Sequence, residues 1–333
     1  MTREIRREIS RRQFLTRSAK AGLSIVCAGS IGYLLHDPEG PSRSTDGTET
    51  VRLPDFSIPG LEPRMCIARG SNREETLGRD IKAMGGIETF VSKGDHVLLK
   101  VNAAFATPPA LSATTHPRLV SEATRLCLKA GASRVIVTDN PINDPASCFA
   151  LTGIASSARE AGAEIFIPEI GHFRPTTLPG GRLIKDWPIL YSPFRGINKL
   201  IGLAPVKDHR RSGASMIMKN WYGLLGGRRN IFHQDIHNII KELAMMVRPT
   251  LVVLDGISSM MTNGPTGGSL SDIKETNTLI VSTDQVAADA FGATLLEKSA
   301  QDLPFIKKAE AEGLGTADFR SINPIAISVN GIG

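Results

Sequence analysis

The chain has 333 residues, of which 41% are hydrophobic and 22% charged, ordinary values for a protein with a sizeable folded core. Its formal net charge is +6, but residues 1–20 hold seven basic and two acidic side chains and account for +5 of it. The rest of the chain is nearly neutral, whereas duplex binding needs a broad basic surface. The composition therefore argues against a nucleic-acid partner.

The first segment has the pattern of an export signal. Residues 10–16 read SRRQFLT, which resembles the twin-arginine motif S/T-R-R-x-F-L-K and departs from it only at Thr16. An apolar stretch follows at 21–35, too short and too weakly hydrophobic for a secure membrane span. We predict a twin-arginine signal over residues 1–36, the twin-arginine translocase as partner and the periplasm as destination. The alternatives are an uncleaved leader that tethers the protein to the membrane, and an ordinary basic amphipathic helix.

The remaining chain divides into a linker and one domain. Residues 37–62 are rich in Pro, Gly, Ser and Thr, which predicts a flexible linker. From 63 to 333, short apolar runs alternate with helical patterns, as expected of a single α/β domain whose mostly parallel, mixed sheet has helices on both faces. The expected strands are 65–68, 95–101, 134–138, 164–167, 199–203, 250–254, 278–282 and 325–329. The expected helices are 74–84, 117–130, 148–161, 214–225, 234–246, 285–297 and 303–312, and a Pro-Gly-Gly turn within 176–192 indicates a hairpin.

Four cysteines occur, at 27, 66, 127 and 148, and none belongs to a C-x-x-C pair. An iron–sulfur cluster or a zinc site supplied by this chain alone is therefore not expected, and the cofactor stays unassigned. Spacing does not decide whether any of the cysteines of the domain form a disulfide.

Polar residues follow most of the expected strands. In open α/β sheets ligands bind beyond the carboxyl ends of the strands, so these residues predict one shared site. They are Lys100 with Asn102, Asp139 with Asn140, Lys207 with His209, Asp255, and Asp284. Asp255 and Asp284 are candidates for holding a metal or orienting the other groups, although Asp284 also suits the cap of the helix that follows it.

The segment 207–233 concentrates positive charge, with Asp208 as its only acidic residue. Clustered cations suit carboxylate or phosphate ligands, so we predict that Lys100, Lys207 and Lys219 bind a small anion. A solvated basic surface is the alternative. The apolar sequence on both sides of Lys219 and Asn220 favours the site, and Asn102 and Asn220 are further ligand-binding candidates.

Histidines supply the candidate proton-transfer groups. These are His209 and His233, with Lys219 as a further catalytic candidate. His233 also precedes His237 by four residues, a spacing that can hold a metal, although one capping and one exposed histidine is the simpler interpretation. His116, before a helix-starting proline, is either a ligand-binding residue or a turn residue.

A glycine-rich loop, Asn-Gly-Pro-Thr-Gly-Gly, occupies residues 263–268. Gly264 and Gly267 are candidates for close backbone approach to a ligand, and an ordinary irregular loop is the alternative. The loop matches neither a phosphate-binding nor a dinucleotide-binding glycine motif.

Taken together, these short motifs resemble a known family. They are Lys-Val-Asn at 100–102, Thr-His-Pro at 115–117, Pro-Val-Lys-Asp-His at 205–209, Lys-Asn-Trp-Tyr-Gly at 219–223, His233, Asp-Gly at 255–256, the glycines at 264, 267 and 268, and Asp284 with Asp289. The pattern is similar to the bacterial and archaeal family known as domain of unknown function 362. The resemblance runs from about residue 64 to about residue 300.

Two departures from this family matter. Many of its members carry a ferredoxin-like cysteine cluster, which this chain lacks, so an iron–sulfur label does not carry over. The family's usual Lys-Thr-His is Lys207-Asp208-His209 here, which puts an acid beside the expected site.

These features favour an exported enzyme that acts on a small carboxylate or phosphate ligand, metal-assisted or redox-linked. The alternative is a non-catalytic periplasmic protein that binds a ligand, or serves redox maturation or a redox partner, without its own iron–sulfur cluster. Whether the protein is an enzyme stays open from the sequence, since no G-x-S-x-G nucleophile elbow is present.

Overall fold

The computed structural model describes residues 11–34 and 50–329, which belong to two separate units. In the first unit, α1 (Arg11–Leu34) is one helix whose side chains are exposed from residue 11 to residue 24. Among the described residues, no helix combines the length and the apolar character that crossing a membrane requires. The remainder of the predicted leader and the first part of the predicted linker, 1–10 and 35–49, lie outside the described residues.

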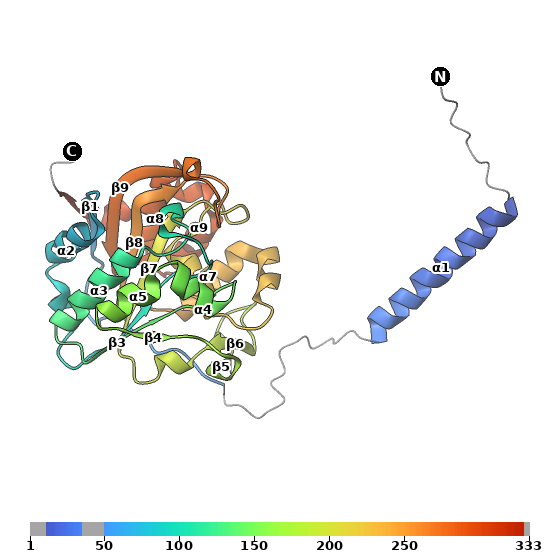
Figure 1. Cartoon of the computed structure of the whole chain (residues 1–333), viewed down its shortest axis with the longest axis horizontal. Helices are drawn as coiled ribbons and strands as arrows, with labels where there is room; N and C mark the ends of the chain where they lie inside the picture. Colours follow the sequence, from blue (N-terminus) through green and yellow to red (C-terminus); the bar gives the residue numbers. More distant parts are fainter. Residues whose placement is uncertain (1–10, 35–49, 330–333) are drawn as a thin grey trace, which may run out of the picture. The chain divides into compact units, whose positions relative to one another are not determined.

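An eight-stranded sheet organises the second unit (Figure 1). Its strand order is β10-β1-β9-β8-β7-β2-β3-β4, and the neighbouring pairs are parallel except the two that involve β9. The mostly parallel, mixed sheet predicted from the sequence is thus confirmed, and β5 with β6 forms a separate antiparallel hairpin. The strands are β1 (Met65–Arg69), β2 (His96–Lys100), β3 (Arg134–Thr138), β4 (Glu164–Phe166), β5 (Phe173–Thr176), β6 (Trp187–Leu190), β7 (Lys199–Lys207), β8 (Leu251–Met260), β9 (Ile273–Ser282) and β10 (Ile325–Ser328).

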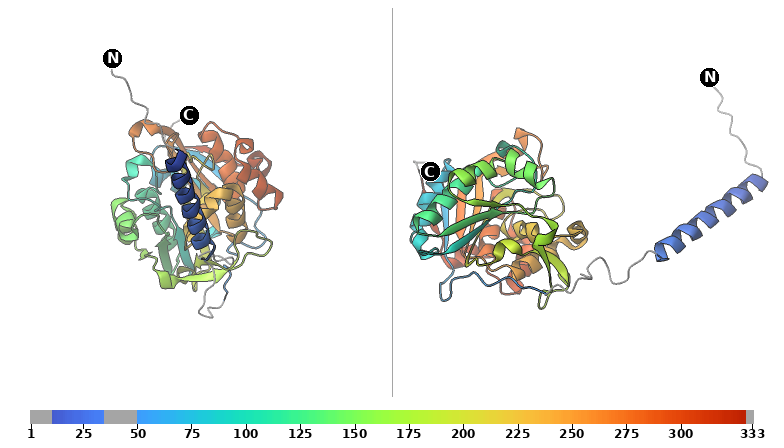
Figure 2. Two further views of the ribbon diagram at one scale, coloured as in Figure 1. Left: turned by 90° about the vertical axis from the view of Figure 1, so that its right-hand side faces the viewer. Right: turned by 60° about the horizontal axis from the view of Figure 1, so that its bottom comes forward.

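Helices cover both faces of this sheet (Figures 1 and 2). Successive side chains of a strand point to opposite faces, so in β2 Leu98 joins the core under α6–α9, while Val97 and Leu99 join the core under α2–α5. The helices are α2 (Arg73–Ala83), α3 (Pro117–Lys129), α4 (Pro145–Leu151), α5 (Ile154–Glu160), α6 (Ile217–Asn220), α7 (Ile236–Met246), α8 (Gln285–Leu295) and α9 (Pro304–Ala311).

Two of the expected helices are shorter than predicted. The helix expected over 148–161 is two helices, α4 and α5, because Gly153 adopts a φ of 72° that interrupts a right-handed helix. The helix expected over 214–225 is reduced to the single turn α6, which continues as a 3₁₀ turn at Trp221–Leu224. Apolar spacing alone did not reveal either interruption.

The segment before β1 differs from the flexible linker expected over 37–62. Its described residues pack along the domain, and Phe56 is buried. The backbone N–H of Phe56 donates to the carbonyl of Arg248 at 2.9 Å, and the hydroxyl of Thr250 donates to the carbonyl of Phe56 at 2.7 Å. A buried aromatic ring and paired backbone groups offset the chain entropy that the composition of this segment would otherwise favour.

The strand order reverses beside β2. After β2 the chain adds β3 and β4 on one side of it, and then returns to place β7 and β8 on the other side. The carboxyl ends of β2, β3, β7 and β8 therefore share one rim, and a reversal of this kind is where open α/β sheets bind ligands. The carboxyl end of β9 lies at the opposite rim, since Ser282 pairs with Val252 near the start of β8.

Candidate functional site

A cavity of about 90 Å³ opens at the carboxyl ends of β2, β3 and β7. It lies at the reversal of the strand order, where the fold itself favours a ligand site. Six residues predicted from the sequence line it: Asn102, Lys207, His209, Lys219, Asn220 and His233. The structure therefore brings together half of the predicted site residues in one cavity.

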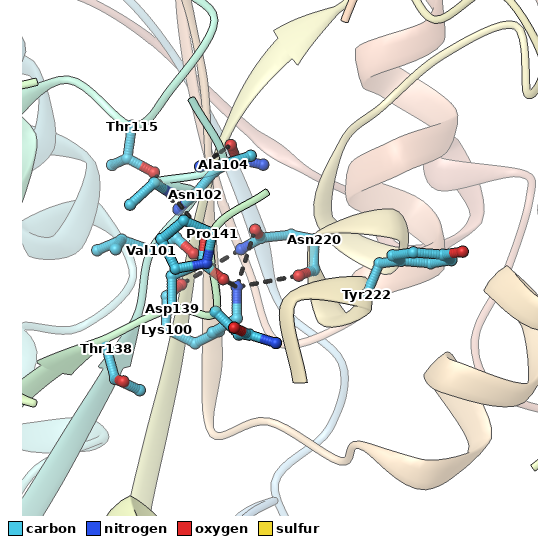
Figure 3. A network of polar contacts seen from close by, with 12 residues as sticks. Lys100, Val101, Asn102, Ala104, Thr115, Thr138, Asp139, Pro141, Asn220 and Tyr222 are labelled. Carbon is cyan, nitrogen blue, oxygen red and sulfur yellow. Dashed lines mark hydrogen bonds and ion pairs between the residues drawn. The ribbon is translucent and has the colours of Figure 1, made fainter. Parts of the chain in front are cut away.

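Lys100 lies behind the wall of this cavity, fully buried at the end of β2. Its Nζ pairs with Asp139 Oδ1 at 2.6 Å and donates to Asn220 Oδ1 at 3.1 Å and to the carbonyl of Val101 at 2.6 Å (Figure 3). Burial lowers the pKa of Lys100, and the Asp139 carboxylate opposes that effect. The ammonium group of Lys100 is thus engaged by the protein and links β2 to β3.

Asn220 joins the short helix α6 to the sheet. Its side-chain nitrogen donates to the carbonyls of Lys100 at 3.3 Å and Leu203 at 3.2 Å, which ties α6 to both β2 and β7. Close packing here depends on Gly223, because a Cβ at this position would lie 1.9 Å from Asp139 Oδ1 and 2.8 Å from Lys100 Nζ. Both ends of the Asn220 amide are therefore used by the fold.

Asp289 of α8 holds the start of the helical turn that carries Lys219. Its carboxylate accepts the backbone N–H of Ile217 at 2.8 Å and of Met218 at 3.0 Å. Burial raises the pKa of Asp289 to about 7, and the two hydrogen bonds oppose that rise. A single helical turn has little stability of its own, so this contact positions Lys219.

Lys207, the last residue of β7, is almost completely buried. Its ammonium donates to the carbonyl of Ala113 and, at 3.5 Å, to Asn102 Oδ1, and it lies 5.3 Å from the centre of the Phe105 ring. Burial, reinforced by the charge of Lys219, lowers the pKa of Lys207 to about 7. One of its three N–H donors remains for a ligand.

Lys219 differs from these two lysines. Its side chain is 9% exposed, and its Nζ lies 5.1 Å from the centre of the Tyr222 ring. Within the described chain its ammonium has neither a hydrogen-bond acceptor nor a carboxylate partner. Burial, followed by the charge of Arg229, lowers the pKa of Lys219 to about 8. A buried ammonium without an acceptor is costly unless a ligand supplies one.

Three groups of the following turn contact Nδ1 of His209: two backbone N–H groups and the Ser212 hydroxyl, which lies 2.9 Å away and can rotate between Nδ1 and the carbonyl of Ala214. The backbone N–H groups of Arg211 and Ser212 both point at Nδ1 from 3.2 Å. Because these donors are fixed in the backbone, Nδ1 is the acceptor and the proton of the neutral ring lies on Nε2. Burial, reinforced by the charges of Lys219 and Lys207, lowers the pKa of His209 to about 2. His209 is therefore a neutral hydrogen-bond donor.

The contacts of His233 assign the other tautomer. Its Nδ1 lies 3.2 Å from the carbonyl of Asn230, which only accepts, and 3.1 Å from the hydroxyl of Tyr222. The Tyr222 hydroxyl donates its own proton to the carbonyl of Arg229, so Nδ1 of His233 is the donor here. Burial, reinforced by the charge of Lys219, lowers the pKa of His233, and its Nε2 carries a lone pair.

Phe105, Asp139, Tyr222 and Arg229 also line the cavity, although the sequence assigned none of them a catalytic or binding role. The guanidinium of Arg229 donates to the carbonyls of Tyr222, Leu225, Asn140 and Pro141, so it contributes charge while its donors hold the surrounding loops. Asp139 directly follows β3, and Arg229 lies in the basic segment, so both carried a sequence signal. Phe105 lies in an irregular loop that gave none.

Other predicted residues lie away from this cavity. Asp255 pairs with Arg73 at 2.7 Å, and His116 lies beside Arg73 in two separate clefts of about 420 Å³ and 360 Å³. Burial, followed by the charge of Arg73, lowers the pKa of His116 to about 4. Asp284 caps α8, where its carboxylate accepts N–H groups of Val286, Ala287 and Thr316. Asp284 is absent from the rim because β9 is antiparallel to its neighbours.

The glycine-rich loop reaches the cavity through Pro265. Gly264 packs against the chain that follows β7, since a Cβ there would lie 1.8 Å from the carbonyl oxygen of Asp208. Asp208 itself pairs with Lys298 at 3.2 Å and does not line the cavity. Gly267 turns the loop with a φ of 61°. Asp208, the acid that replaces the family's usual threonine, is thus paired with Lys298 outside the cavity.

In the described ranges, no three His, Cys, Asp or Glu side chains are grouped so as to hold a metal ion. His237, proposed as an alternative metal partner of His233, instead stacks on Phe305 with ring centroids 6.2 Å apart. The cysteines at 66, 127 and 148 are free and buried.

The fold and the cavity define an α/β protein with a cationic pocket at a reversal of strand order. The chain belongs to the family described as domain of unknown function DUF362, whose model matches residues 97–294. This match confirms the resemblance carried by the short motifs.

Two further proteins are similar to this chain. The thylakoid-associated protein sll1697 of Synechocystis sp. is 25% identical over 247 residues, which cover 70% of this chain and 73% of that protein. The solved lactate racemase apoprotein of Thermoanaerobacterium thermosaccharolyticum is 14% identical, with a TM-score of 0.36. That match covers 79% of this chain and spans 58% of the racemase chain.

Proposed function

We propose that the cavity binds a small anion, either a carboxylate or a phosphate. The observation that carries this proposal is uncompensated charge: Lys207, Lys219 and Arg229 line the cavity, while the carboxylate among its lining residues, Asp139, is paired with Lys100. The ammonium of Lys219 lacks an acceptor within the described chain. A bound anion would supply that acceptor and neutralise the neighbouring cations.

We further propose that the protein is an enzyme that moves a proton on this anion. His233 offers a lone pair on Nε2 and can act as a base, whereas His209 offers an Nε2–H that can donate a hydrogen bond to developing negative charge. His209 is buried and His233 partly buried, both beside cations, which favours the neutral forms of both rings. An imidazole must be neutral to accept a proton, and a neutral imidazole can also donate a hydrogen bond.

Calorimetric titration with acetate and with inorganic phosphate tests the binding site. Lys219→Met should weaken the affinity tenfold or more, since a tenfold change corresponds to about 1.4 kcal/mol and a charge-assisted hydrogen bond contributes more than that. Lys185 is an exposed lysine between β5 and β6, so Lys185→Met is the matched control and should bind as the parent protein does. Equal affinity in Lys219→Met, or no binding in the parent, would refute the site.

Proton transfer is tested separately. The protein is incubated in heavy water with carboxylic acids that it binds, and NMR follows deuterium uptake at the carbon beside the carboxylate of each acid. His233→Gln should abolish this exchange while anion binding persists, because glutamine keeps a polar side chain but is no base. Binding without any exchange in the parent protein would instead favour the ligand-binding alternative.

We also propose export by the twin-arginine translocase, supported by the motif that begins α1. Arg11 and Arg12 are exposed, as a signal read by a translocase requires. A variant with Arg11→Lys and Arg12→Lys should accumulate in the cytoplasm on cell fractionation, whereas Arg17→Lys should be exported normally. Equal export of the double variant would refute this assignment. Recovery with washed membranes or in the free periplasmic fraction distinguishes an uncleaved tether from a cleaved leader.

A further inference from the structure

The three lysines of the site differ in what engages their nitrogen atoms. Lys100 is paired with Asp139, and Lys207 donates to a backbone carbonyl. Lys219 is nine-tenths buried and lines the cavity. Within the described chain, the one partner of its ammonium group is the ring of Tyr222, through a cation–π contact. Hydrogen bonds or an ion pair fix the direction of a lysine nitrogen, whereas a nitrogen without them can turn towards a ligand and attack it as an amine. Lys219 alone among the three has this freedom.

We infer that Lys219 is a nucleophile that forms an imine with the carbonyl carbon of a small 2-oxo acid. This inference rests on the proposed anion site and specifies its ligand: the carboxylate of the acid would meet Lys207, and its 2-oxo group would meet Lys219. Amines that attack carbonyl groups are commonly lysines placed in desolvated pockets beside other cations. The pKa of Lys219, lowered to about 8 by burial first and then by Arg229, leaves roughly a tenth of it as free amine at pH 7.

The two histidines provide the remaining steps. The lone pair of Lys219 Nζ attacks the carbonyl carbon and forms the C–N bond, while His209 Nε2–H donates a hydrogen bond to the carbonyl oxygen. His233 Nε2 takes the two nitrogen protons in turn and passes both to that oxygen, which leaves as water when the C–O bond breaks. One amine and one carbonyl compound give one imine and one water, with no oxidant or reductant.

The size of the cavity agrees with a ligand of this class. Its volume is about 90 Å³, below the roughly 300–1,000 Å³ of pockets that hold drug-sized ligands, so it suits a small molecule. Pyruvate is the smallest 2-oxo acid with a ketone.

Reductive trapping tests the inference in the full-length protein. The protein is incubated with pyruvate and sodium borohydride at pH 8, digested, and analysed by mass spectrometry. We expect one reduced pyruvate adduct on Lys219, and none when pyruvate is omitted. Lys219→Arg retains the positive charge without the nucleophile, so it should lose the adduct. Lys185→Arg is the exposed control and should be labelled like the parent.

The outcomes separate the inference from the function on which it rests. Acetate binding without an adduct, or an adduct on Lys207 in place of Lys219, overturns the imine and leaves the anion site intact. If calorimetry also shows no binding of acetate or pyruvate, the anion site is refuted together with the imine.

Discussion

His209 and His233 stack with ring centroids 5.9 Å apart and planes inclined by 21°, yet their hydrogen bonds select opposite tautomers. One ring receives backbone N–H groups at Nδ1, and the other faces a backbone carbonyl at the same atom. The pair therefore presents a donor and an acceptor from one wall of a cationic cavity. This relationship is the basis of the proposed proton transfer, and it is measurable without knowing the substrate.

Nitrogen-15 NMR of histidine-labelled protein should show these two tautomers directly. We expect the proton of His209 on Nε2 and the proton of His233 on Nδ1 at neutral pH. His209 should not titrate between pH 5 and pH 8, because burial and the adjacent lysines lower its pKa to about 2. The same tautomer in both rings, or a His209 that titrates near pH 6.5, would contradict the assignment.

Anion binding should take up protons between pH 7 and pH 8. The pKa of Lys207 is lowered to about 7 and that of Lys219 to about 8, in both cases chiefly by burial, and a bound anion raises both values. Affinity should consequently fall as the pH rises above 8. Calorimetry in buffers with different ionisation enthalpies measures this uptake, and heats of binding that do not depend on the buffer at pH 8 would oppose the prediction.

Removing a buried lysine should alter how stability depends on pH. Since the folded-state pKa of Lys207 lies below its unfolded value, the unfolded chain binds more protons, and stability rises with pH above 7. The full effect of one lysine is about 1.4 kcal/mol per pH unit. Urea unfolding from pH 7 to pH 9 should show a shallower rise for Lys207→Met than for the parent protein. An unchanged slope in this variant, with Lys185→Met as reference, would show that Lys207 titrates normally.

The ion pair between Lys100 and Asp139 should be strongly coupled. Each single variant, Lys100→Met or Asp139→Asn, leaves a buried group without its partner, and the cost expected for breaking a buried pair is about 3–5 kcal/mol. The double variant should lose less than the sum of the two. Unfolding free energies of all four proteins give the coupling, and strict additivity would mean that the pair contributes nothing.

Gly223→Ala should damage both stability and anion binding. The added methyl would meet Asp139 Oδ1 at 1.9 Å and Lys100 Nζ at 2.8 Å, so the network behind the cavity must shift. Overpacking of this kind costs about 1–3 kcal/mol. Gly171→Ala is the matched control, because a Cβ there meets nothing within 4 Å. Similar melting temperatures for the two variants would show that the network tolerates the methyl.

Much of the site followed from one rule about strand ends. The polar residues after β2 and β7 met at one cavity because those strands are parallel neighbours. The same rule failed for Asp284, because β9 is antiparallel to β8. The apolar pattern of a strand does not indicate its direction in the sheet. The rule also did not distinguish the residues that line the cavity from Asp255 and His116, which lie beside Arg73 outside it. The segment around Phe56 packs against the domain, although its composition predicted a flexible linker.

The sequence by itself determined the class of fold, the family motifs and the concentration of cations between β7 and α7, because these depend on local patterns and residue types. Only the tertiary structure decided which cations keep partners. Lys100 meets Asp139 across two strands, whereas Lys219 meets no acceptor in the described chain, and such pairings depend on contacts between residues far apart in sequence. The tautomers of the two histidines were settled in the same way, by backbone groups that only folding brings within hydrogen-bond distance.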